Sequence, residues 1–127
     1  LTHGMRRAQR AMAGFLPLID WQRMRRAPLE AKARTFHAFA CGDERQAVAW
    51  VVRRGATAAD GRIDPARVTP SQPIEIAMPD GRYAITGWDT EAGRRLAPTE
   101  AVAADGRLRF TAEGLRGDRA FAVRRVG

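Results

Sequence analysis

The spacing of apolar residues is helical in the first part of the chain. Apolar side chains recur there at i, i+3 and i+4, at Met5, Ala8, Met12, Phe15 and Ile19. This spacing places them on one face of a helix and predicts a helical segment over Thr2–Arg26. Pro17 interrupts the pattern, so we expect the helix to end or kink near Phe15. Pro28–Lys32 follows as a connector, and residues 1–32 form the predicted N-terminal helical segment and connector.

From Arg34 onward the period changes to two, which is the pattern of strands with one buried face. Seven stretches show this pattern: Thr35–Cys41, Arg45–Arg54, Ile74–Met78, Arg82–Asp89, Leu96–Ala103, Arg107–Ala112 and Asp118–Val126. Turn residues separate them at about 8–12 residues, as in all-β sandwiches. The sequence therefore predicts a mainly β protein. We expect an antiparallel β-sandwich of about seven strands, immunoglobulin-like, over residues 33–127.

The stretch Pro73–Arg95 is predicted to organise this domain. Apolar residues alternate over Ile74–Met78, and Asp80-Gly81 follows at once. Asp-Gly is a strong hairpin signal, because a type I′ turn needs positive φ at both central residues. The chain returns over Arg82–Asp89 and turns again at Thr90–Gly93. This arrangement predicts an antiparallel meander.

Two details of the other stretches lead to sharper expectations. Both faces of Arg45–Arg54 are apolar, which favours a central strand covered on both sides and a buried Trp50. Pro98 lies inside Leu96–Ala103 and cannot donate a ladder hydrogen bond. That stretch is therefore predicted to be an edge strand or to contain a bulge.

The charge balance favours a basic surface. Lys and Arg total 22 against 14 Asp and Glu, giving a formal net charge of +8, and Lys32 is the only lysine. Such a charge is typical of proteins that bind nucleic acid or another polyanion. The arginines, however, are spread over every predicted strand and form no single stripe with interleaved aromatic residues. A solvated Arg-rich surface accounts for them better, and a basic binding module for an anionic polymer or nucleic acid stays open as the alternative.

Candidate chemistry is sparse. Cys41 is the only cysteine, and His3 and His37 have no third ligand at metal spacing. No serine or cysteine lies in a nucleophile context, and most carboxylates lie in turns. We therefore expect no catalytic residue, no metal site and no cofactor. No apolar run approaches the ~20 residues of a membrane span, so we expect no membrane partner. The start at Leu1 suggests a fragment or a processed product.

Tyr83 and Trp88 are the candidate carbohydrate contacts, because an exposed aromatic ring can stack on the apolar C–H face of a sugar. The alternative is that these two rings and Trp50 fill the core, since β-sandwiches need large inward side chains.

Three stretches carry a resemblance. AQRAMAGFLPLIDWQRMRRAPL (Ala8–Leu29) looks like the last helix of a catalytic barrel with its exit. ERQAVAWVVRR (Glu44–Arg54) and the Gly-x-Tyr…Trp-Asp-Thr…Gly pattern from Gly81 onward look like strands of the domain that follows such barrels. Together they resemble the C-terminal β-sandwich of bacterial glycoside hydrolases of the cellulase or mannanase kind. Similar domains carry a collagen-binding label, which we do not transfer.

The resemblance implies a non-catalytic accessory domain. In those enzymes the barrel holds both catalytic carboxylates, so no catalytic residue is carried over to this chain. The implied role is to brace the barrel and to contact carbohydrate. The implied partner surface consists of Met12, Phe15, Ile19 and Trp21, facing the barrel or, in a fragment, a second copy of the chain. A small hydrolase in its own right remains a third interpretation.

Overall fold

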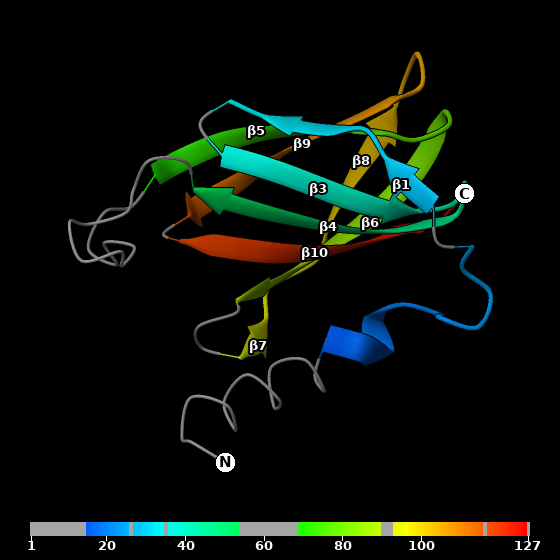
Figure 1. The fold of residues 1–127 in the computed structure, drawn as a ribbon, viewed down its shortest axis with the longest axis horizontal. Coiled ribbons are helices and arrows are strands. Elements are labelled where there is room, and N and C mark those ends of the chain that lie inside the picture. Colours follow the sequence, from blue (N-terminus) through cyan, green and yellow to red (C-terminus); the bar gives the residue numbers. More distant parts are fainter. Residues whose placement is uncertain are drawn as a thin grey trace.

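The computed structural model describes residues 15–25, 27–34, 36–53, 69–89, 93–115 and 117–126, and most of these lie in β-strands (Figure 1). The elements in chain order are the short 3-10 helix η1 (Leu16–Leu18), β1 (Ala27–Leu29), β2 (Ala31–Ala33), β3 (Phe36–Gly42), β4 (Gln46–Arg53), β5 (Thr69–Ala77), β6 (Gly81–Asp89), β7 (Arg94–Arg95), β8 (Thr99–Ala103), β9 (Arg107–Leu115) and β10 (Asp118–Arg125). The expectation of a mainly β protein is confirmed.

The predicted N-terminal helix is not supported over its described part. Pro17 lies in η1, and the chain is extended again at Ile19, with φ −124° and ψ 140°. Proline has no backbone N–H to donate to the preceding turn, so Pro17 interrupts an α-helix that would run through it. Residues 1–14, with Met5 and Met12, lie outside the described residues. Pro28–Lys32 is also not a plain connector, because parts of it form β1 and β2.

The strands form two antiparallel sheets. One contains seven strands in the order β1-β3-β4-β10-β6-β7, with β8 also paired to β6. The other contains three strands in the order β2-β5-β9. β1 and β2 follow each other directly in the chain but pair with β3 and β5, so this short stretch passes from one sheet to the other.

All seven predicted strands are present, as β3, β4, β5, β6, β8, β9 and β10. β8 begins at Thr99, directly after Pro98, and its pairing partner is β6. Pro98 therefore precedes the strand and does not lie inside it as predicted, whereas the predicted edge position is confirmed, because β8 pairs with β6 alone among the described strands. The short strands β1, β2 and β7 were not predicted.

The predicted hairpin at Asp80-Gly81 is wrong. β5 pairs with β2 and β9, whereas β6 pairs with β10, β7 and β8, so the turn joins two different sheets. The Asp80 carboxylate instead accepts a hydrogen bond from the backbone N–H of Gly106 at 2.8 Å. The Asp105-Gly106 turn does have two positive φ values, 56° and 73°. Even there, β8 and β9 leave the turn for different sheets.

The main core lies between side chains of both sheets. The seven-stranded sheet supplies large rings such as Phe36 and Tyr83, and the three-stranded sheet supplies Ile74, Ile76 and Leu108. All of these are buried. Across the core, the rings of Phe110 and Phe121 meet edge-to-face at 5.2 Å between centroids, a favoured geometry for aromatic pairs. One inner face of each sheet is thus removed from water.

Candidate functional site

The two predicted carbohydrate contacts lie in the interior. Tyr83 is fully buried, and its hydroxyl donates to the carbonyl oxygen of Pro79 at 2.7 Å. Burial raises the pKa of this hydroxyl, although the Arg125 guanidinium above the ring opposes that shift. Trp88 is 6% exposed and packs edge-to-face on Phe15 at 6.4 Å. Neither ring is open to a sugar, and the core interpretation describes both of them.

Trp50 contradicts the core interpretation, because its side chain is 46% exposed. β4 turns Ala47, Ala49 and Val51 toward the main core, so Trp50 points to the opposite, outer face of the seven-stranded sheet. The two apolar faces of β4 correctly indicated a central strand, because β4 lies between β3 and β10. None of the described segments covers the outer face at Trp50.

Trp50 and Phe39 form an exposed aromatic pair, which we call the aromatic platform. They are paired residues of β4 and β3, their ring centroids are 6.2 Å apart, and their planes are tilted by 38°. Phe39 is 57% exposed. The indole N–H of Trp50 donates to Asp118 Oδ2 at 3.0 Å, which fixes the orientation of the ring. His37, two residues before Phe39, is also exposed and adds a polar group on the same face.

The platform could have been found from the sequence. His37 and Phe39 share one face of their strand, and an exposed histidine marks that face as the outer one. Counting outward from the β3–β4 turn pairs Phe39 with Trp50. The prediction that Trp50 is buried rested on the apolar content of the two strand faces alone.

The segment 15–25 covers another part of the same outer face. Ile19 and Met24 are buried against Ala122 of β10, with Trp21 packed beside them. The segment thus packs on the chain's own sheet through Trp21 and Met24. Phe15, Ile19 and Trp21 therefore contact this domain itself, which leaves little of the predicted partner surface free within the described residues.

The side-chain amide of Gln46 holds this segment in place. Its Oε1 accepts from the backbone N–H of Asp20 at 2.7 Å, and its Nε2 donates to the backbone carbonyl of Asp20 at 3.2 Å. Gln46 is buried, and this reciprocal pair satisfies both of its polar groups. The amide therefore ties the start of β4 to a segment 26 residues away in the chain.

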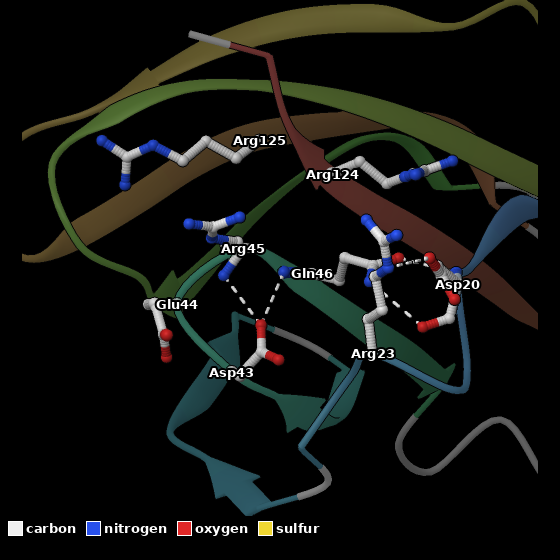
Figure 2. A pocket seen from close by; sticks show the side chains of 8 residues that line it. All are labelled: Asp20, Arg23, Asp43, Glu44, Arg45, Gln46, Arg124 and Arg125. Atoms are coloured by element: carbon white, nitrogen blue, oxygen red, sulfur yellow. Dashed lines mark hydrogen bonds and ion pairs between the residues drawn. The ribbon is translucent and has the colours of Figure 1, made fainter.

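An open pocket of about 750 Å³ lies beside this contact, and we call it the arginine pocket (Figure 2). It is lined by Asp20, Arg23, Asp43, Glu44, Arg45, Gln46, Arg124 and Arg125. Arg124 and Arg125 come from the end of β10, residues 43–45 from the β3–β4 turn, and Gln46 from the start of β4. The pocket thus forms where one end of the seven-stranded sheet meets the segment 15–25.

The carboxylate of Asp43 shapes the β3–β4 turn. Oδ1 accepts from the backbone N–H groups of Arg45 and Gln46 at 2.8 and 3.0 Å, and Oδ2 accepts from that of Arg25 at 2.9 Å. Partial burial opposes ionisation, but these three hydrogen bonds outweigh it and lower the pKa of Asp43. Asp43 is therefore an ionised structural group.

A second charged cluster lies on the outer face of the three-stranded sheet. Glu75 Oε1 accepts from Arg109 Nε at 2.8 Å, and Oε2 lies 3.2 Å from Lys32 Nζ and 3.4 Å from Arg107 Nη1. The contact with Lys32, followed by that with Arg109, lowers the pKa of Glu75 against its partial desolvation. Part of the chain's positive charge is thus neutralised internally.

Neither metal ligation nor membrane crossing is evident in the described residues. There, no group of three or more His, Cys, Asp or Glu side chains is placed to hold a metal ion. Over the same ranges, no helix is long and apolar enough to cross a bilayer. No protein-family model and no curated protein matches this sequence.

Proposed function

We propose that this chain is a non-catalytic accessory domain of a glycoside hydrolase, which braces a catalytic barrel and contacts carbohydrate through Phe39 and Trp50. The proposed architecture is an immunoglobulin-like β-sandwich, supported by the core that the two sheets share. The exposed aromatic platform is the observation that carries the binding role. The origin in a glycoside hydrolase rests on the sequence resemblance alone.

The platform suits a sugar for three physical reasons. Two exposed rings on the sheet offer an apolar surface of the kind that the C–H face of a pyranose covers. The hydrogen bond to Asp118 orders the indole before binding, so less conformational entropy is lost. Covering roughly 100 Å² of apolar surface is worth about 2–3 kcal/mol at ~25 cal/mol per Å². A gain of this size corresponds to a dissociation constant of roughly 10 mM, so we expect weak binding.

Titration calorimetry with cello- and manno-oligosaccharides tests the carbohydrate role. Trp50→Ala should abolish binding, and Trp50→Phe should keep part of it. Because the side chain is half exposed, Trp50→Ala should lower the free energy of unfolding by only about 1 kcal/mol. Val102→Ala removes a 68% exposed apolar side chain on β8 and is the matched control. Unchanged sugar binding in Trp50→Ala would refute the role of the platform.

The alternative, a basic module for an anionic polymer, is favoured by the formal net charge of +8. Ionic strength separates the two roles, because phosphate contacts release counterions and weaken steeply with salt. Sugar stacking should barely change over a roughly tenfold range of salt. Steeply salt-dependent polyanion binding, with no oligosaccharide binding at any salt concentration, would favour the alternative. If the domain braces a catalytic barrel, we expect the gene that encodes it to encode a barrel domain upstream of it.

A further inference from the structure

β9 is the long edge strand of the three-stranded sheet. It contains nine residues, and among the described strands it pairs with β5 alone. The other outer strands of the two sheets, β1, β2, β7 and β8, contain only two to five residues each. β1 contains Pro28 and β8 begins directly after Pro98, whereas β9 contains no proline. Short strands and prolines protect a sheet edge from pairing with another chain, and β9 has neither protection.

The free side of β9 presents open backbone groups. Arg107 turns its N–H and C=O away from β5, where both bond to the backbone of Ala104. Because alternate residues of a strand point their backbone groups to the same side, those of Arg109, Thr111 and Glu113 also point away from β5. Of these, only the C=O of Glu113 has a partner among the described residues, a guanidinium of β10. The edge therefore offers a row of donors and acceptors to another strand.

A row of alternating charge crosses the outer face of this sheet and ends at the free edge. Lys32 of β2 is paired across the strands with Glu75 of β5, and Glu75 is paired with Arg109 of β9. Arg109 Nε donates to Glu75 at 2.8 Å, and the terminal nitrogens of this guanidinium make no other contact with the described residues. Glu113 is exposed on the same face of β9, and its carboxylate has no ion pair there. The row thus ends in a cation, and the same edge carries an unpaired anion.

We propose that two copies of this chain pair through their β9 edges, antiparallel and centred on Thr111. In this register Arg109 lies opposite Glu113 of the second copy, and the twofold axis repeats the same pair. The second carboxylate extends the alternating charge row by one anion, and opposite charges in facing positions stabilise a strand pair. The register also joins the outward backbone groups of residues 109, 111 and 113, which form the hydrogen-bonded pairs of an antiparallel ladder.

Other registers of the same two edges fit less well. Centring the pair on Arg109 or on Glu113 places like charges directly opposite each other, which destabilises a strand pair. Shifting the centre by one residue from Thr111 leaves Arg109 opposite Thr111 or Leu115, without an anion. The charge pattern of β9 therefore selects one register. The inference is independent of the proposed carbohydrate role, because the aromatic platform lies on the other sheet.

Sedimentation equilibrium of the full chain measures the dissociation constant of the dimer. Glu113→Lys places a cation opposite Arg109 twice in the symmetric dimer, so the dissociation constant should rise roughly tenfold or more. Glu100→Lys makes the same charge change on the exposed strand β8 and is the matched control, with an expected change of about twofold or less. Thr111→Pro removes the central outward N–H but no hydrogen bond to β5. It should therefore abolish the dimer and keep the wild-type far-UV circular dichroism spectrum.

A second charge reversal tests the register itself. Arg109→Glu should weaken self-association as Glu113→Lys does, and an equimolar mixture of the two variants should associate again, because each chain then supplies the charge that the other needs. A mixture that stays monomeric would overturn the proposed register. A wild-type chain that is monomeric at every concentration, or a dimer that survives both Glu113→Lys and Thr111→Pro, would overturn the proposal. So would an equal loss in Glu113→Lys and Glu100→Lys, since net charge would then account for it.

Discussion

Replacing Gln46 by alanine should loosen the segment 15–25 from the seven-stranded sheet. The amide makes two hydrogen bonds to the backbone of Asp20, and it lies under the segment with little exposure. Alanine removes both hydrogen bonds, so the backbone N–H and C=O of Asp20 must bind water or stay without a partner. The perturbation thus acts at one anchor and leaves the strand ladders untouched.

The expected magnitude follows from the bonds lost and the contacts kept. Two hydrogen bonds at about 0.5–1.5 kcal/mol each give a loss of about 1–3 kcal/mol in the free energy of unfolding. Burial of Ile19 and Met24 still holds the segment, at about 1.5–3 kcal/mol per side chain. We therefore expect a loosened segment, with amide exchange at Asp20 faster by roughly 10–100-fold.

Urea denaturation and hydrogen exchange measure the two effects separately. Gln46→Glu keeps an acceptor for the Asp20 N–H but has no donor for its carbonyl, so it should show an intermediate loss. Gln22→Ala changes an exposed glutamine of the same segment and is the control. If Gln46→Ala leaves both the urea midpoint and the Asp20 exchange rate at wild-type values, the amide does not anchor the segment.

Two further predictions concern buried and charged groups. Tyr83→Phe keeps the ring but removes the hydrogen bond to the Pro79 carbonyl oxygen. It should lower the free energy of unfolding, measured by urea denaturation, by about 1–2 kcal/mol. An unchanged urea midpoint would show that this hydrogen bond adds no net stability. The folded-state pKa values of Asp43 and Glu75 are lowered from 3.8 and 4.5, so their stabilisation is present above those values and is lost as the pH falls through the folded-state values. The free energy of unfolding should therefore decrease as the pH is lowered below about 4. The decrease should be less steep in Asp43→Asn and as steep as in the wild type in the exposed control Glu100→Gln. The same pH dependence in Asp43→Asn and wild type would contradict this.

The Asp-Gly signal for a turn with two positive φ values holds at Asp105-Gly106 but not at Asp80-Gly81, and it did not report strand pairing. The positive φ values of Asp105 and Gly106 follow from an Asp-Gly pair in a tight turn. Asp80 is a bend without positive φ, and β5 and β6 on either side of it belong to different sheets. A turn signal reports the conformation of a few residues. Which strands pair depends on contacts between residues distant in sequence, such as β5 with β9 and β6 with β10.

The sequence by itself determined the class of structure and the positions of seven strands, because a period of two places alternate side chains on opposite faces wherever a strand lies. It did not determine which outer surfaces are covered. Trp88 is buried because Phe15 packs on it, whereas Trp50, on the same face, is covered by no segment among the described residues and is exposed. The arginine pocket likewise exists only because the segment 15–25 meets the ends of β4 and β10. Those contacts join residues far apart in the chain, so only the tertiary structure decides them.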